Sequence, residues 1–305
     1  MELAGKFKKF LHHHSSAVMI GLSFLLWIFL FRDFLSGKSA LVYDAISYYD
    51  HIKFYIENIR HGVFPLWDPV WSYGSPNDFF LRRIGPFNPC LFLIPLFDFL
   101  GLTYTRAYLA YLAVYYLIGL IGFYLLANRL FGDRKIAFAA YALLLFSALG
   151  TRLFDSYIVL MCVPMAWFFY FLTAFTQNPQ RRYLLGMTFA LMNVMTTYIP
   201  FYFITVLLLF LACFVVVYAR DLSKIFVRYF AFLKNNKIFM VFCIVAFLCA
   251  CAPGFIFFKD SRKGEFVLPS RYSGASVDSA LAVGNQMTNP WSFAEEVMYS
   301  SFFWL

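Results

Sequence analysis

The sequence predicts an all-α fold, a polytopic membrane helix bundle of about seven spans with a large extracytoplasmic first loop that carries interfacial helices. Apolar residues make up 62% of the chain and charged residues only 13%, whereas a soluble domain carries about a quarter charged residues. The apolar residues fall in long runs, and most charges lie between those runs. Runs of this kind are typical of helices that cross a lipid bilayer.

Seven apolar segments are candidates for membrane spans. They cover residues 17–34, 107–127, 136–149, 157–175, 184–199, 201–219 and 238–258. A further apolar run at 90–100 is too short to cross a bilayer and is expected to be an interfacial or re-entrant piece. The fifth and sixth segments are separated at Tyr198, Ile199 and Pro200, because proline moves the residue before it away from helical geometry.

The distribution of Lys and Arg predicts the orientation of the chain. The N-terminal tail 1–16 and the short loops 128–135, 177–183 and 220–237 together are dense in basic residues, and such loops stay on the cytoplasmic side. This places the first outer loop, 35–106, and the outer tail, 259–305, on the other side of a cytoplasmic (inner) membrane. We expect one transmembrane domain over 1–305, continuing in a longer parent chain.

Composition also argues against several classes of function. The net charge of +9 reflects these basic loops and indicates no nucleic-acid partner, since no basic run is interleaved with exposed aromatic residues. The six cysteines form no Cys-x-x-Cys pair, so we interpret them as small apolar side chains and not as a disulfide framework or a metal site. Ionisable residues are almost absent from the spans, which argues against a proton-coupled transporter.

The first outer loop holds most of the polar chemistry of the chain. Apolar residues recur at helical spacing over 43–60, which predicts an amphipathic helix on the membrane surface that ends at His61 and Gly62. Two Pro- and Gly-rich clusters at 62–69 and 73–76 predict an ordered turn region. Its Trp67 could lie among lipid headgroups or stack on a sugar. The remaining polar side chains of this loop are assigned to the solvent face: Asp50, His51, Glu57, His61, Asp68 and Asp78.

Asp44 stands at the N-terminal edge of this helix, just beyond the outer end of the first span. A carboxylate at this height faces the level of a lipid phosphate, where it could act as a general base or hold a metal ion that bridges phosphate oxygens. It could equally cap the helix, because Asp is a favoured N-cap residue. The two roles are compatible with each other.

A pattern in the first outer loop resembles that of the glycosyltransferase C superfamily. It consists of an Asp after the first span, an amphipathic helix, a G-x-x-P-L-W motif, a G-x-P turn and G-P-F-N-P, carried here by Asp44, Tyr48, Gly62, Pro65, Leu66, Trp67, Gly74, Pro76 and Pro89. The loop looks most like those of the YfhO-type bacterial membrane proteins and of the dolichyl-phosphate-mannose mannosyltransferase-like group. The segments 268–272 and 289–291 of the tail are also similar to the YfhO type.

This resemblance implies a function. It implies transfer of a sugar from a polyprenyl-phosphate-linked donor to a cell-envelope glycan or glycolipid acceptor, with Asp44 as the catalytic carboxylate. Asp155 matches a second carboxylate of some members, although it could instead pair with Arg152 or cap the fourth span. Asp44 is followed by Ala45 and not by a second acid, which leaves metal dependence open; a divalent cation, Mg or Mn, would have Asp44 as its ligand.

An anionic donor needs cations at the outer surface to hold its phosphate. The candidates for this contact are Arg82, Arg83, Arg152, Lys259, Arg262, Lys263 and Arg271, with Trp67 and Tyr48 as further substrate contacts. The cluster 259–263 could also be an ordinary solvated loop, because Asp260 and Glu265 lie beside it. Two other functions are compatible with the pattern: a non-enzymatic transporter or flippase of lipid-linked precursors, and a membrane scaffold protein.

Overall fold

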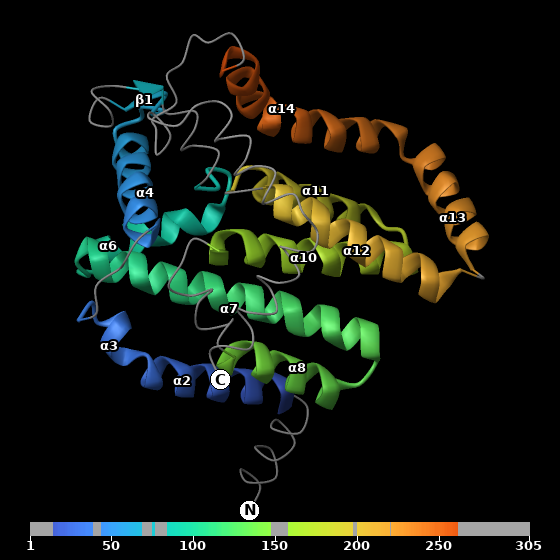
Figure 1. Cartoon of the computed structure of the whole chain (residues 1–305), viewed down its shortest axis with the longest axis horizontal. Helices are drawn as coiled ribbons and strands as arrows, with labels where there is room; N and C mark the ends of the chain where they lie inside the picture. The colour runs from blue at the N-terminus through green and yellow to red at the C-terminus, as the bar shows by residue number, and fades with distance from the viewer. Residues whose placement is uncertain are drawn as a thin grey trace, which may run out of the picture. The chain divides into compact units, whose positions relative to one another are not determined.

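The computed structural model describes residues 15–38, 44–68, 75–76, 84–147, 158–197, 200–219 and 221–261. Within them the chain is mostly helical (Figure 1). The helices are α2 Ser15–Leu30, α3 Arg32–Leu35, α4 Asp44–Arg60, the 3₁₀ turn η2 Pro89–Phe92, α6 Leu93–Phe99, α7 Tyr104–Phe131, α8 Arg134–Phe146, α10 Ile158–Gln177, α11 Arg181–Met195, α12 Pro200–Tyr218, α13 Leu222–Asn235 and α14 Lys237–Ser261.

The chain divides into two compact units. The first comprises 1–65 with 80–252, and the second comprises 66–79 with 253–305. In the second unit two short strands, β1 Trp67–Asp68 and β2 Ser75–Pro76, pair antiparallel, with Trp67 opposite Pro76. Residues 69–74, which join the two strands, lie outside the described residues, so the ordered turn region stays a prediction. The other elements belong to the first unit, except that the part of α14 after Ala252 belongs to the second.

Helices occupy all seven segments that the sequence marks as apolar. Among the described residues, two of them, Tyr104–Phe131 and Val159–Gln177, are long and apolar enough to cross a membrane by themselves. The helices Leu222–Asn235 and Lys237–Ala252 pass the same test only as a pair bent by 91°. The helical class and the presence of helices able to cross a membrane are therefore confirmed, and the number of seven spans and the large first loop stay predictions.

The first unit is built outward from α7. This helix packs between α8 and α10; α10 then packs against α11, α11 contacts α12, and α2 lies against α8 (Figure 1). The link between α7 and α8 is short because Gly132 takes a left-handed conformation, φ +69°, and Asp133 caps α8 by accepting from the Lys135 N–H at 2.6 Å. Short links of this kind make neighbouring helices antiparallel.

Small residues allow α7 and α10 to approach closely. A Cβ added at Gly119 would lie 2.6 Å from Val163 Cγ2, and one added at Gly122 would lie 3.0 Å from the Trp167 ring. The Trp167 indole N–H donates to the Ile118 carbonyl at 3.0 Å. In lipid, where helices gain little from burying apolar surface, such packing and interhelical hydrogen bonds are what hold a bundle together.

Helix α4 confirms the predicted amphipathic helix and corrects its environment. It stands across the N-terminal end of α7 (Figure 1), and it ends where Gly62 has φ +72° and Val63 N–H bonds back to Asn58. Its apolar side chains Tyr48, Ile52 and Ile56 are buried in the same core as Ala107 and Tyr108 of α7. The apolar face therefore packs on protein and not on lipid.

Most of the predicted connection 220–237 forms a helix, α13, which the sequence did not lead us to expect. Apolar residues recur through it at helical spacing, as at Leu222, Ile225 and Tyr229. The helix has 14 residues, too few to cross a bilayer, and a search for spans alone passes over a helix of that length.

We predict that the α7–α10 contact does not tolerate a methyl group. Gly119→Ala should lower the stability of the purified protein by about 1–2 kcal/mol, because the added Cβ overlaps Val163. Gly21→Ala in α2 is the matched control, since nothing lies within 4 Å of its Cβ position, and it should be neutral or slightly stabilising. Thermal unfolding in detergent measures both. Equal stability of the two variants would contradict this packing, and Val163→Ala should partly rescue Gly119→Ala.

Candidate functional site

The candidate site is the end of the bundle at which α4, η2, the start of α7 and the end of α11 meet. The segment Ile84–Asn88 joins these elements. Ile84 forms an isolated β-bridge with Thr197, and Gly85 N–H donates to the Thr196 carbonyl at 3.1 Å. Gly85 is needed here, because its φ is +66° and an added Cβ would lie 3.3 Å from Thr197 Cγ2. A loop that follows Arg82 and Arg83 is thus fixed to α11.

Asn88 ties the same segment to α7. Its side-chain oxygen accepts from the Cys90 N–H at 3.0 Å, which caps η2, and its amide nitrogen lies 3.3 Å from the Tyr111 hydroxyl. Asn88 and Tyr111 are both buried. Their hydrogen bonds satisfy polar groups that would otherwise be stranded inside the protein.

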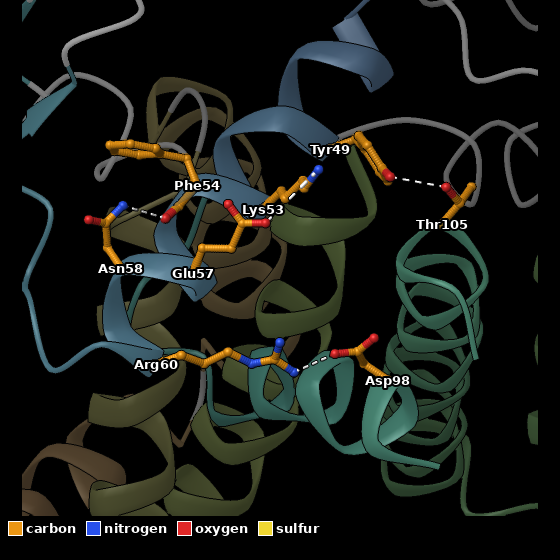
Figure 2. A network of polar contacts seen from close by, with 8 residues as sticks. All are labelled: Tyr49, Lys53, Phe54, Glu57, Asn58, Arg60, Asp98 and Thr105. Atoms are coloured by element: carbon orange, nitrogen blue, oxygen red, sulfur yellow. Dashed lines mark hydrogen bonds and ion pairs between the residues drawn. The ribbon is translucent and has the colours of Figure 1, made fainter. Parts of the chain in front are cut away.

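Further bonds hold α4 to its neighbours, and two of them appear in Figure 2. The Tyr49 hydroxyl and Thr105 Oγ1 are 3.0 Å apart, and Arg60 Nη2 donates to Asp98 Oδ2 of α6 at 2.8 Å. On the inner face the Tyr55 hydroxyl donates to the Pro86 carbonyl at 3.1 Å. Burial raises the pKa of Tyr55 above its ordinary value, so this hydroxyl remains a donor. The position of α4 is therefore set along its whole length.

The outer face of α4 carries charge. Lys53 Nζ lies 4.0 Å from Glu57 Oε1 (Figure 2). It also lies 5.6 Å from the centre of the Tyr104 ring. Asp50, Glu57 and His61 are exposed, as predicted. The prediction is wrong for two members of that set, because His51 and Asp68 are buried, with 7% and 5% of their surface exposed. His51 occupies the inner face of α4, one residue before the buried Ile52. Asp78 lies outside the described residues.

Asp44 is the first residue of α4. The residues before it lie outside the described residues, so its role as a helix cap stays a prediction. The first turn of a helix presents backbone N–H groups and the positive end of the helix dipole, which favour an ionised carboxylate and other anions. The structure describes the backbone of Asp44 and not its side chain.

The structure places few of the other predicted site residues. Tyr48 is buried on the inner face of α4 with 6% of its surface exposed, whereas Trp67 on β1 is 57% exposed. Lys259 lies in the last turns of α14. The remainder lie outside the described residues: Arg82, Arg83, Arg152, Asp155, Arg262, Lys263 and Arg271. The role of Asp155 as a second carboxylate therefore stays a prediction. Among the described residues, no group of three or more His, Cys, Asp or Glu could hold a metal ion.

The opposite end of the bundle is strongly basic. Arg129 Nη1 donates to Gln177 Oε1 at 2.8 Å across the α7–α10 contact, and Arg181 Nε donates to Asn236 Oδ1 at 2.6 Å. Arg228 Nη1 reaches the Gln177 carbonyl at 3.4 Å. These cations bond to neutral acceptors, so they keep their full positive charge at this end.

Sequence reasoning missed the residues that fix this end of the bundle, namely Tyr49, Tyr55, Asn88, Asp98 and Thr105. Only Asn88 carries a local signal, because Asn followed by Pro is typical of a turn that starts a helix. The others are ordinary side chains whose partners lie far along the chain. The chain matches no protein-family model, no curated protein and no solved structure.

We predict that Asn88 holds this end of the bundle together. Asn88→Ala strands the Cys90 N–H and the Tyr111 hydroxyl, and should destabilise the protein by about 2–3 kcal/mol. Asn88→Asp keeps the acceptor for Cys90 and loses the donor to Tyr111, so it should fall between the wild type and Asn88→Ala. Thermal unfolding and amide hydrogen exchange over 84–92 measure the effect. Unchanged exchange in Asn88→Ala would refute this role.

Proposed function

We propose that this protein transfers a sugar from a polyprenyl-phosphate-linked donor to a cell-envelope glycan or glycolipid, on the outer face of the cytoplasmic membrane. The observation that carries the proposal is the position of Asp44 at the start of α4. This helix is fixed across the end of α7, one of the helices able to cross a membrane. The resemblance of the first loop to glycosyltransferase C proteins supports the same assignment.

The proposed chemistry uses Asp44 as a general base. Its carboxylate takes the proton of an acceptor hydroxyl while that oxygen attacks the anomeric carbon of the sugar. The bond between this carbon and the phosphate oxygen breaks, and its electron pair leaves with the polyprenyl phosphate. An ionised carboxylate suits this role, and the first turn of a helix favours the ionised form.

The donor phosphate needs cations near Asp44. Arg82 and Arg83 are the strongest candidates, because they directly precede a segment that is fixed in place. In that segment Ile84 is anchored to Thr197, and the Pro86 carbonyl accepts a hydrogen bond from Tyr55 of α4. A site on a fixed support can hold a phosphate with little loss of conformational entropy. Arg152, Lys259, Arg262, Lys263 and Arg271 remain further candidates for this contact, as does a divalent cation held by Asp44. Asp155 remains the candidate second carboxylate.

We predict that Asp44→Asn abolishes sugar transfer, with a loss of at least about 100-fold, because an amide cannot accept the proton. Asp50→Asn is the matched control: it makes the same change one and a half turns along α4, on the exposed face, and should keep nearly full activity. The assay is transfer from a radiolabelled polyprenyl-phosphate sugar in membranes. Full activity in Asp44→Asn would exclude the proposed base, and flipping of the donor lipid without transfer would favour the flippase.

The basic end of the bundle supports an orientation. Positive residues near span ends are retained in the cytoplasm, so the end with Arg129 and Arg181 is cytoplasmic and the end with α4 is extracytoplasmic. We predict that a reporter enzyme active only outside the cytoplasm works when fused after Gly101, at the α4 end, and fails when fused after Gly132. The reverse pattern would refute both the orientation and an outer-face reaction.

A further inference from the structure

Helix α13 has an apolar arc, and only half of this arc packs against the bundle. Ile225 is buried, and Tyr229 and Phe232 pack on Phe175 of α10, with ring centres 5.3 and 5.2 Å apart. On the adjoining part of the same arc, Phe226 and Phe230 are 54% and 69% exposed. Two large aromatic side chains one turn apart are thus presented to the surroundings of the bundle.

The orientation of α13 relative to α14 indicates that these two side chains face a lipid bilayer. The helix turns by 91° into the segment Lys237–Ala252 of α14. Beyond Lys237 at its start, the side chains of that segment that face outward are apolar, with Ile238 89% and Phe242 58% exposed, as expected for a helix in contact with lipid. A helix at a right angle to such a segment lies along the membrane surface, where an exposed aromatic face enters the region between headgroups and acyl chains.

The charge around α13 identifies the lipid. In the described segments 129–135, 177–183 and 221–237, Lys and Arg far outnumber acids; the acids are Asp133 and Asp221, and the cations are Arg129, Arg134, Lys135, Arg181, Arg182, Lys224, Arg228, Lys234 and Lys237. Lys224 forms an ion pair with Asp221 at 2.9 Å. Lys234 lies one turn after Phe230 and therefore on the same side of α13, and Lys237 stands at the bend beside Ile238. Both are exposed.

We propose that α13 is a membrane-surface helix that binds anionic phospholipid headgroups. Phe226 and Phe230 insert among the acyl chains, while Lys234 and Lys237 extend along the apolar surface to lipid phosphates, as long basic side chains do at membrane interfaces. The α13–α14 corner is thereby held at the bilayer surface. This binding does not depend on the proposed sugar transfer.

The first test locates α13 relative to lipid in the full-length protein. A photo-crosslinking amino acid replaces either Phe230 or the exposed Ala231, which is about a quarter turn further round the helix. The protein is reconstituted in bilayers of phosphatidylcholine with phosphatidylglycerol and irradiated. We expect lipid adducts at position 230 and at least severalfold fewer at 231. Equal yields, or none at 230, would overturn the insertion of this face.

The second test addresses the headgroup. Lys234→Gln/Lys237→Gln is compared with Arg134→Gln/Lys135→Gln, which removes the same charge from the start of α8 at the same end of the bundle. Spin-labelled lipids measure the preference of each protein for phosphatidylglycerol over phosphatidylcholine. The first variant should lose this preference by up to about fivefold for each cation, and the control should keep it. Equal loss in both variants, or no loss in the first, would overturn the assignment to α13.

Discussion

The close approach of α7 and α10 is the constraint on which the rest of the unit depends. Gly119 and Gly122 let the helices touch at Val163 and Trp167, and the Trp167 N–H bonds to the Ile118 carbonyl across the contact. Pro164 in α10 lacks an N–H to offer the Leu160 carbonyl, and the Tyr115 hydroxyl of α7 lies 3.5 Å from that oxygen. In lipid a backbone carbonyl without a partner is costly, so the sequences of the two helices are matched to each other. The remaining helices pack around this pair.

The two ends of this unit differ in chemistry. One end holds α4 and the segment Ile84–Asn88, where hydrogen bonds between neutral groups fix the loops, and it carries the exposed carboxylates Asp50 and Glu57. The other end carries α13 and cations bound to neutral acceptors. An end with positive charge suits an anionic leaflet, and a rigid end with carboxylates suits chemistry on a lipid-linked substrate. The proposed function and the proposed lipid contact therefore use opposite ends of one scaffold.

Local patterns account for the elements that were predicted correctly. Long apolar runs identify α7 and α10, helical spacing identifies α4, and the His61–Gly62 pair marks its end. Local patterns fail for α13, which is amphipathic and too short to be a span. In that part of the chain only apolar segments long enough to cross a membrane were predicted to be helices. Local patterns also fail for His51 and Asp68, since a polar residue in a charged loop gives no local sign of burial. The partners that bury it come from distant segments.

For this protein, the sequence by itself determines the helical class, the apolar segments, the basic loops and the position of Asp44 beside an amphipathic helix, because these depend on composition and on spacing within a few turns. Only the tertiary structure decides which face of α4 is buried, that Asn88 links η2 to Tyr111, and that α13 turns by 91° from α14. Each of these depends on which side chains meet across long separations in the chain. The stretch around Asp44 is a candidate site by its sequence, and it has a fixed support because of contacts that no local pattern contains.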